Sequence, residues 1–295
     1  MIKKTAMITI AGRPNVGKST LTNTIVGEKV AIVSNKPQTT RNRITAVLNR
    51  DETQIVLIDT PGFHKARTRL GDYMVKVVRE SVADVDAVAL IIEPVANVGT
   101  QEEALIQRIK ESRVPSVLVI NKIDTVSKEA LLAVIALYSE AHNFDAIVPV
   151  SARKGDGVQQ LLDEFEKYAI EGPQLFPDGM TSDQPEKQIC AEIVREKLLI
   201  CLDKEIPHGT AVEVTKFSER ENEIIDLDVT IYCEKSSHKG IIIGKQGAML
   251  KKIGEMARME IEAFMGTKVF LQTWVKVKEN WRDSQSLLRN FGYNE

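Results

Sequence analysis

The sequence of 295 residues predicts an α/β domain with a doubly wound, mostly parallel sheet, followed by a smaller α+β domain. Short apolar segments alternate with helical segments as far as residue 170, which is the order that β-α-β units produce. A stretch rich in proline and glycine, residues 171–188, then has the composition of a linker. Beyond it, helices and strands follow in a different order. We therefore expect domains at residues 1–170 and 189–295.

A glycine-rich loop follows the first expected strand, residues 7–10, and precedes the first expected helix, residues 20–26. Strand, loop and helix in this order form the frame of a phosphate-binding loop, because the loop N–H groups and the helix dipole attract phosphate oxygens. Lys18 would reach the β- and γ-phosphates, and the Ser19 hydroxyl would bind Mg²⁺. The alternative is an ordinary glycine turn before a helix. The candidate phosphate-binding residues are Gly12, Arg13, Pro14, Asn15, Val16, Gly17, Lys18, Ser19 and Thr20.

A long polar loop, residues 27–43, comes next, and long loops in compact domains are usually functional. It lies where a nucleotide-sensing loop would lie. The hydroxyl of Thr40, or alternatively that of Thr39, would complete the Mg²⁺ shell and contact the γ-phosphate. The other interpretation is a solvated loop of serine and threonine.

Two apolar segments, residues 44–48 and 55–58, predict a β-hairpin that leads into Asp59, Thr60, Pro61 and Gly62. A carboxylate at the carboxyl end of a buried strand, here Asp59, can hold Mg²⁺ through water. The Gly62 N–H would then contact the γ-phosphate. The next residue, Phe63, cannot orient a water molecule as glutamine does in many nucleotide switches. We expect a metal site made of Ser19, Thr40 and Asp59, with Lys18, Thr40 and Gly62 supporting hydrolysis.

The rest of the first domain continues the alternation. Near-continuous apolar runs predict strands that are buried on both faces, and Thr100–Glu103 has the pattern of a capping box that starts a helix. Strands are expected at residues 85–92, 116–120 and 146–150, and helices at residues 70–82, from 100, at 129–141 and at 158–170.

The segment Asn121-Lys122-Ile123-Asp124 follows a buried strand and suits recognition of guanine. Guanine presents N1–H and N2–H₂, two donors that the Asp124 carboxylate can accept together, whereas adenine lacks them in this arrangement. An unpaired buried acceptor is costly, so the discrimination should be large. Asn121 and Lys122 would brace the base and the loop, and the backbone of Ser151 and Ala152 would contact the guanine O6. The alternative is a helix N-terminal turn with an aspartate cap.

The second domain begins with an expected helix and continues as a mixture of strands and helices. Its clearest motif is G-x-x-G, which is weak alone, because a chain with 17 glycines contains about one by chance. An apolar turn at Gly240–Ile243 leads into the motif, and lysines at 235, 239, 245, 251 and 252 form a local basic patch, although such patches are often only solvated surface. Helices are expected at residues 189–202, 249–264 and 281–289, and strands at 210–217, 224–232 and 269–277.

The motifs of the first domain resemble, in order and spacing, the five guanine-nucleotide motifs of small GTPases. The phosphate loop and Gln38-Thr39-Thr40-Arg41 look like the bacterial branch related to translation factors, and the second domain looks like a type II KH domain. Together they are similar to the Era family of bacterial ribosome-assembly GTPases, over essentially the whole chain. The resemblance implies a GTPase with GTP or GDP and Mg²⁺ as ligands.

The resemblance also implies RNA as a partner, because a KH loop clamps the backbone of single-stranded nucleic acid. In the Era family the partner is 16S ribosomal RNA of the 30S subunit, and nucleotide state biases RNA binding. The candidate RNA-binding residues are Lys239, Ile241, Ile242, Ile243, Gly244, Lys245, Gln246, Gly247, Lys251 and Lys252, with the isoleucines as an aliphatic floor for bases. Some relatives use the asparagine equivalent to Asn15 to bind K⁺, which makes K⁺ a candidate cofactor and Asn15 a candidate catalytic residue; an Asx-turn is the alternative.

Composition restricts the remaining choices. The net charge of −2 provides no global attraction to nucleic acid, so RNA binding must use a local patch. Three cysteines without a C-x-x-C pair suggest buried thiols in a reducing compartment, and no apolar run approaches a membrane span. We expect a cytoplasmic monomer, with peripheral contact at the inner face of the membrane left open. Two rival functions are a nucleic-acid-dependent ATPase, which Asp124 disfavours, and a GTP-binding adaptor with negligible hydrolysis, which Phe63 keeps open.

Overall fold

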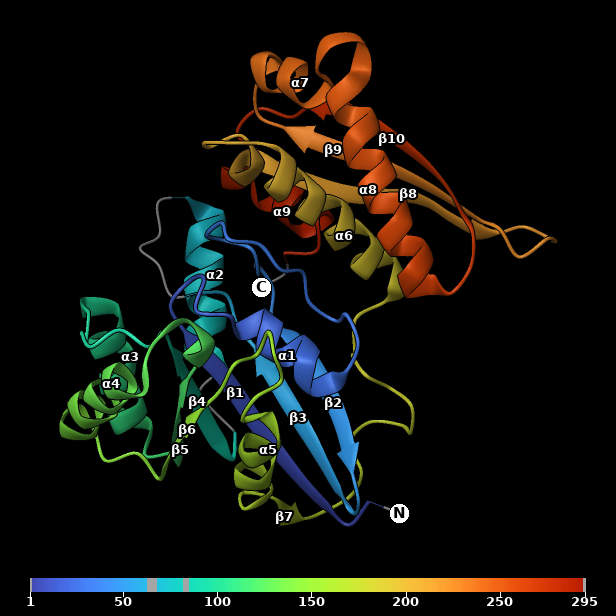
Figure 1. Cartoon of the computed structure of the whole chain (residues 1–295). Coiled ribbons are helices and arrows are strands. Elements are labelled where there is room, and N and C mark those ends of the chain that lie inside the picture. Colours follow the sequence, from blue (N-terminus) through green and yellow to red (C-terminus); the bar gives the residue numbers. More distant parts are fainter. Residues whose placement is uncertain (1, 63–67, 82–84, 294–295) are drawn as a thin grey trace. The chain divides into compact units, whose positions relative to one another are not determined.

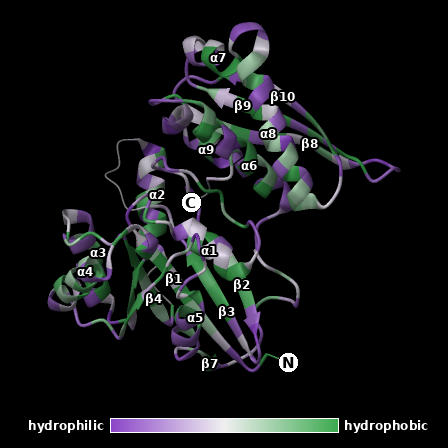
Figure 2. Ribbon diagram, in the orientation of Figure 1, coloured by the Kyte–Doolittle hydropathy of each residue, from purple (hydrophilic) through white to green (hydrophobic). Residues whose placement is uncertain are grey.

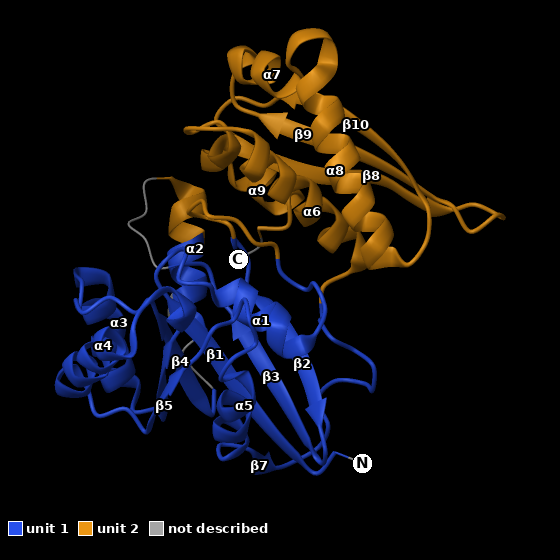
Figure 3. Cartoon of the chain, in the orientation of Figure 1, with its two compact units in different colours: residues 1–31, 40–65, 74–183 blue, residues 32–39, 66–73, 184–295 orange. Residues whose placement is uncertain are grey.

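The computed structural model describes residues 2–62, 68–81 and 85–293 (Figure 1). The chain divides into two compact units (Figure 3). Unit 1 comprises residues 1–31, 40–65 and 74–183, and unit 2 comprises residues 32–39, 66–73 and 184–295. The predicted Phe63 lies outside the described residues.

Unit 1 is built on a sheet with the strand order β2-β3-β1-β4-β5-β6, and β7 pairs with β1 at the side. Strands β3, β1, β4, β5 and β6 are parallel, whereas β2 is antiparallel to β3. This arrangement confirms the predicted mostly parallel α/β fold. The strands are β1 (Lys4–Gly12), β2 (Ile44–Arg50), β3 (Thr53–Asp59), β4 (Ala87–Ile92), β5 (Ser116–Ile120), β6 (Ala146–Pro149) and β7 (Ile170–Glu171).

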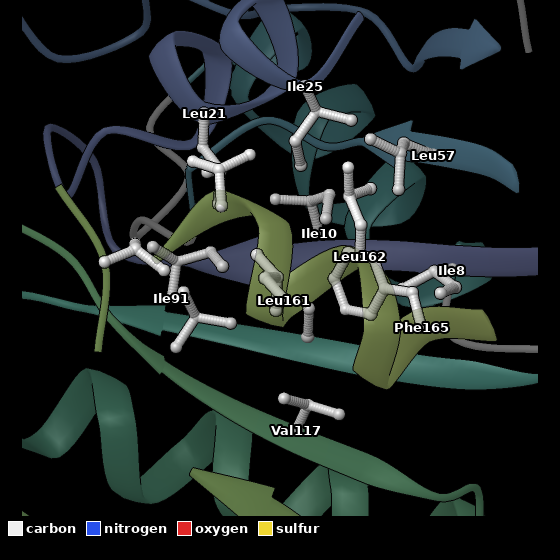
Figure 4. Close-up of a cluster of buried hydrophobic side chains, with 14 of the residues drawn as sticks. Ile8, Ile10, Leu21, Ile25, Leu57, Ile91, Val117, Leu161, Leu162 and Phe165 are labelled. Atoms are coloured by element: carbon white, nitrogen blue, oxygen red, sulfur yellow. The ribbon is translucent and has the colours of Figure 1, made fainter. Parts of the chain in front are cut away.

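Helices cover both faces of this sheet, because successive strand residues point to opposite faces and both sets are apolar. Figure 4 shows one face, where Leu21 and Leu161 pack over Ile8, Ile10 and neighbouring strand residues. On the other face, Leu90 and Leu118 belong to a second core cluster. Figure 2 shows apolar residues concentrated along the strands. The helices are α1 (Lys18–Val26), α2 (Arg69–Glu80), α3 (Thr100–Ser112), α4 (Lys128–Ala141) and α5 (Val158–Glu166).

Two local predictions in unit 1 were wrong. Helix α3 begins at Thr100 as expected, but its N-cap is Gly99 without a side-chain hydrogen bond, so Thr100–Glu103 is not a capping box. Helix α5 ends at Glu166 instead of continuing to residue 170. The reason is that Ile170 pairs with Thr5 and forms the short strand β7, and this pairing needs extended backbone.

Unit 2 contains a three-stranded sheet in the order β10-β9-β8, in which β9 is antiparallel to β8 and parallel to β10. Helices α6 and α8 pack against this sheet, and Val229 and Ile231 lie in its core with Ile253 and Ile261 of α8. The unit confirms the predicted smaller α+β domain. Its elements are α6 (Glu186–Cys201), β8 (Thr210–Glu219), β9 (Ile225–Cys233), α7 (Ser236–Ile243), α8 (Ala248–Met265), β10 (Val269–Val277) and α9 (Gln285–Asn290).

The structure differs from the sequence interpretation at two places in unit 2. Residues 240–243, expected as an apolar turn, belong to helix α7, which begins at Ser236 and whose Ile242 is fully buried in the core. Residues 281–289, expected as one helix, form a 3₁₀ turn at Trp281–Asp283 and then α9. The Trp281 indole N–H donates to the Gly209 carbonyl, and this buried contact anchors the turn. Within the described ranges, no helix is both long and apolar enough to cross a bilayer.

Candidate functional site

The phosphate-binding loop joins β1 to α1 at the carboxyl edge of the parallel sheet. Ile10 in β1 lies opposite Asp59 at the end of β3, and Gly12 at the end of β1 lies opposite Ile91 in β4, so the carboxyl ends of these strands lie together. At Gly17 the backbone has φ of 96°, and an added Cβ would lie 2.3 Å from the Asn121 side-chain nitrogen. Only glycine therefore fits at this position. The absence of a side chain at Gly17 lets the Asn121 amide approach the loop and donate to the Val16 carbonyl at 2.8 Å.

Lys18 lies inside the loop with 6% of its surface exposed. Its ammonium donates to the carbonyl oxygens of Gly12 at 3.1 Å and Arg13 at 2.9 Å. Burial lowers the pKa of Lys18 to about 8, and the nearby Asp59 carboxylate partly opposes this shift. The side chain is thus a desolvated cation among backbone carbonyls, which suits contact with phosphate oxygens.

Three oxygen-bearing side chains meet beside this loop. The Ser19 hydroxyl donates to Asp59 Oδ2 at 2.7 Å and lies 2.8 Å from the Thr40 hydroxyl. Thr39 does not join them, because its hydroxyl donates to the Lys36 carbonyl at 2.6 Å. Hydroxyl and carboxylate oxygens are the ligands that Mg²⁺ prefers. The residues predicted for the metal site therefore fit this cation.

The segment after β3 lies against the loop. The Thr60 hydroxyl donates to the Ile10 carbonyl at 2.9 Å, and this bond ties the segment to β1. Pro61 is buried and Gly62 half-buried. A Cβ on Gly62 would lie 2.8 Å from backbone atoms of Pro14, which places the Gly62 backbone directly beside the phosphate loop.

The predicted guanine-binding residues also come together, at the ends of β5 and β6. The Asn121 side-chain oxygen accepts from the N–H of Ala152 at 3.0 Å and from that of Lys122 at 2.8 Å. The exposed Asp124 carboxylate accepts a hydrogen bond from the Ser151 hydroxyl at 2.8 Å. This bond is the main cause of the lowered pKa of Asp124. The carboxylate is therefore ionised and held as an acceptor.

Sequence reasoning missed two acidic residues that brace these loops. Glu93, which directly follows β4, forms ion pairs with Lys122 at 2.5 Å and Arg13 at 3.6 Å. Glu102 of α3, with only 2% exposed, is also ion-paired with Arg13. The Lys122 ammonium reaches the Asn15 carbonyl at 2.8 Å as well. A position at the carboxyl end of a strand was the available signal for Glu93.

Binding of Mg·GTP to the nucleotide-free protein is expected to release protons near pH 6 and take them up near pH 8. Burial raises the pKa of Asp59 to about 6, so about half of this carboxyl is protonated there and loses its proton when it meets a cation. Near pH 8 Lys18 is about half deprotonated and gains a proton when it meets phosphate. Calorimetry in buffers of different ionisation enthalpy measures both directions.

The control is Asp59→Asn, which separates this carboxyl from the titrating γ-phosphate. The variant should release fewer protons near pH 6. It should still take up protons through Lys18, but at a lower pH than the original protein, because the Asp59 carboxylate no longer opposes the lowering of the Lys18 pKa. Equal release by the variant and the original protein would contradict the assignment.

The G-x-x-G motif of unit 2 forms a 3₁₀ turn between α7 and α8. Gly244, Gln246 and Gly247 have φ of 73°, 49° and 80°, and the Gly247 N–H donates to the Gly244 carbonyl at 3.2 Å. Lys245, Lys251 and Lys252 are exposed, and Lys239 is half-exposed. The loop therefore presents backbone and basic side chains to the solvent.

A groove of about 330 Å³ runs from this loop between α8 and β10. Residues Leu250, Gly254, Arg258, Leu271 and Thr273 line it and were missed by sequence reasoning. Their signal is periodicity, since Gly247, Lys251, Gly254 and Arg258 follow helical spacing and Leu271 and Thr273 alternate along a strand.

The structure corrects the expected aliphatic floor of isoleucines. Ile242 is 0% exposed and belongs to the core of unit 2, so its side chain cannot pack against a base. Ile241 is 50% exposed, and Ile243 is half-buried against the core. The apolar lining of the groove comes instead from Leu250 and Leu271.

Comparison with known proteins agrees with both halves of this description. A family model described as a 50S ribosome-binding GTPase matches residues 7–122, and a KH-domain model matches residues 205–282. The GTPase Era of Ruminiclostridium cellulolyticum is 54% identical over 293 residues, covering 99% of this chain and 98% of that protein. The GTPase Era of Clostridioides difficile is 48% identical, with 99% of each chain covered.

Solved structures give the same result. A crystal structure of Era with MgGDPNP and nucleotides 1506–1542 of 16S ribosomal RNA has a TM-score of 0.95 and 36% identity, and covers 100% of both chains. A variant of Aquifex aeolicus Era bound to GDP·AlF₄⁻ also has a TM-score of 0.95, at 37% identity, covering 99% of this chain and all of that one. Because the sequence identity extends over the full length and the fold is shared, this chain belongs to the Era family of GTPases.

Proposed function

We propose that this chain is a GTPase switch that couples binding and hydrolysis of Mg·GTP to binding of single-stranded 16S ribosomal RNA during assembly of the 30S subunit. The observation that carries the proposal is the meeting of Lys18, Ser19, Thr40 and Asp59 beside one loop, in a chain that also carries a KH groove. The Era structure with MgGDPNP and 16S RNA supports the pairing of these two ligands.

The nucleotide-binding residues have separate roles in this proposal. Lys18 contacts the β- and γ-phosphates, while Ser19 and Thr40 bind the cation directly and Asp59 orients its water ligands. Mg²⁺, when bound, neutralises charge on the transferred phosphoryl group. Asp124 selects guanine. Asn121 hydrogen-bonds both the phosphate loop, at Val16, and the Ala152 backbone, and so fixes the position of one relative to the other.

K⁺ is proposed as a second cation. Asn15 has a left-handed backbone, with φ of 67°, and its carbonyl accepts from Lys122, so the loop conformation is fixed around it. A monovalent cation beside the β- and γ-phosphates would supply the positive charge that an arginine finger supplies elsewhere. This matters because Phe63 cannot orient the attacking water.

The division of labour along the chain is part of the same proposal. Residues 1–170 bind nucleotide, 171–188 link the domains, and 189–295 bind RNA. Residues 171–183 belong to unit 1, where the Val47 N–H donates to the Thr181 carbonyl, so only the last part of the linker, residues 184–188, lies outside this unit. We propose a cytoplasmic monomer that can contact the inner face of the membrane peripherally.

In the RNA-binding half, the G-x-x-G turn clamps the sugar-phosphate backbone and the groove receives the bases. Lys245 and Lys251 supply local charge, and Gly254 leaves space at the centre of the groove wall, since a Cβ there would meet nothing within 4 Å. Glycine inside a helix costs about 1 kcal/mol relative to alanine. Access to the groove is a reason to retain it.

Gly254→Leu is expected to stabilise helix α8 while it weakens binding of single-stranded RNA from the 3′ end of 16S RNA by about tenfold or more, because the new side chain fills the groove. Fluorescence anisotropy measures RNA binding. Phosphate release from GTP, with and without this RNA, in KCl and in NaCl, measures the enzyme. Hydrolysis without RNA should match the unmodified protein and be faster in KCl.

The matched control is Ala263→Leu, which adds the same side chain to the exposed surface of α8 outside the groove. Unchanged RNA affinity in Gly254→Leu would contradict the groove assignment. No phosphate release in either salt would favour the GTP-binding adaptor. Displacement of bound GDP by ATP as effectively as by GTP would favour a nucleic-acid-dependent ATPase.

A further inference from the structure

Residues 32–39, the part of the nucleotide-sensing loop that precedes Thr40, belong to unit 2 (Figure 3). They are held there by helix α6. The Val33 N–H donates to the Glu196 carboxylate at 2.7 Å, and the Lys36 ammonium donates to the Leu202 carbonyl. This segment of the loop is therefore bound to helix α6 and to the residue that follows it, at Val33 and at Lys36.

Among these contacts from α6, those of Arg195 are with the residues directly before Thr40. Its guanidinium donates to the carbonyl of Gln38 at 3.3 Å and to the carbonyl of Thr39. The same group is ion-paired with Glu192 one turn earlier in α6. Two donors on a rigid, planar group thus fix two consecutive carbonyls.

The burial of this region is unusual for its composition. Arg195, Glu196 and Lys197 are consecutive charged residues with 0%, 3% and 6% of their surface exposed. Such residues are almost never fully buried without partners. The partners here are Glu192 and Glu260 of unit 2 and the backbone of residues 33–39. Neither matching family model covers α6, so its charged residues are not part of the motifs that define the two domains.

We propose that Arg195 is a positioning residue for GTP hydrolysis: from helix α6 it fixes the two carbonyls before Thr40 and so presents the Thr40 hydroxyl to the Mg·GTP site. The inference rests on the proposed role of Thr40 as a cation ligand. Thr40 follows Thr39 directly, and its hydroxyl lies 2.8 Å from that of Ser19. Only the triphosphate state uses this arrangement fully, so the contact favours GTP over GDP.

A second segment supports the same conclusion. Residues 66–73, which come shortly after Gly62, are also part of unit 2. The Arg69 N–H donates to the Asp283 carboxylate at 3.0 Å, and the rings of Tyr73 and Tyr293 pack edge to face. Thr40 and Gly62 are the two predicted γ-phosphate contacts. The segment just before Thr40 and a segment shortly after Gly62 thus both belong to the RNA-binding unit.

Arg195→Met is expected to lower the affinity for Mg·GDPNP relative to GDP by about tenfold, within the usual range of coupling between sites. Hydrolysis should slow, while GDP affinity stays within about twofold of the original protein, because GDP does not need Thr40. Arg195→Lys keeps the charge but loses the paired donors and should give an intermediate ratio. If Arg195→Met does not fold, Arg195→Lys carries the test by the same ratio. Lys187→Ala, at an exposed position of α6, is the matched control and should leave the ratio unchanged.

The outcomes separate this inference from the proposal beneath it. Thr40→Ala should lower the same ratio. If Thr40→Ala lowers the ratio and neither Arg195 variant does, the positioning role of Arg195 is wrong. If none of them lowers it, the role of Thr40 fails and the inference fails with it. Equal weakening of GDP and GDPNP by an Arg195 variant would indicate a merely structural residue and would also overturn the inference.

Discussion

Asp124→Asn is expected to reduce GTP affinity by a hundredfold or more and to create affinity for xanthine nucleotides. In the proposed site the carboxylate accepts from two guanine donors, and hydrogen bonds to a charged group contribute about 1.5–3 kcal/mol each. Asparagine replaces one acceptor by a donor, which faces the guanine N2–H₂ unfavourably but can donate to the C2 carbonyl of xanthine. Competition against a fluorescent GDP analogue measures GTP, XTP and ATP in one assay.

The XTP arm is an internal control, since a variant that is merely unfolded would lose both nucleotides. Ser151→Ala adds a graded test, because the Ser151 hydroxyl holds the Asp124 carboxylate at 2.8 Å. Its loss should weaken GTP binding by about tenfold, the value of one ordinary hydrogen bond, without admitting XTP. If Asp124→Asn still prefers GTP to XTP, guanine is recognised elsewhere.

Lys18→Met is expected to slow single-turnover GTP hydrolysis by about a thousandfold. The ammonium is buried among the carbonyls of Gly12 and Arg13, and in the proposed site it contacts the β- and γ-phosphates of the bound nucleotide. Removing one fixed donor to the transition state costs about 10²–10³ in rate, and the loss of a full positive charge places Lys18 at the upper end. Methionine keeps the length and volume of the side chain. Quench-flow measurement of phosphate release gives the rate.

Lys128→Met, at the exposed start of α4, is the matched control and should leave the rate unchanged. The pH profile provides a second check. Because the pKa of Lys18 in the nucleotide-free protein is about 8, GTP binding by the original protein should weaken as the pH rises above 8. This decline should disappear in Lys18→Met. A decline that survives the substitution would belong to another group.

The nucleotide site was predictable because each of its motifs follows a strand whose apolar run is visible in the sequence. Asp59 is the last residue of β3, Asn121 follows β5 directly, and Ser151 comes shortly after β6. Parallel strands bring their carboxyl ends to one edge of the sheet. The chain order of strands and loops was therefore enough to place these residues together. The sequence did not distinguish Thr39 from Thr40; in the structure the Thr40 hydroxyl lies beside that of Ser19, whereas the Thr39 hydroxyl donates to the Lys36 carbonyl.

The parts that were not predictable depend on tertiary contacts that local patterns do not encode. Residues 236–243 contain glycine and three isoleucines, which favour turn or strand, yet burial of Ile242 makes them a helix. Three consecutive charged residues, Arg195-Glu196-Lys197, are typical of exposed helix surface. Apart from Glu192, their partners outside the triplet lie more than 150 positions earlier or some 60 later in the chain. The groove lining was missed for the same reason, since Leu271 joins α8 only through the fold.

The side chain of Asn121 has a kinetic consequence. One amide holds the Val16 carbonyl of the phosphate loop and the Ala152 N–H of the base-binding loop, so neither loop can loosen without disturbing the other. In the proposed site a nucleotide binds one loop through its phosphates and the other through its base. Release of one end alone would leave the other end still bound. We therefore expect the nucleotide to leave in one concerted step, and a disturbance of either loop to shorten the residence time of the whole nucleotide.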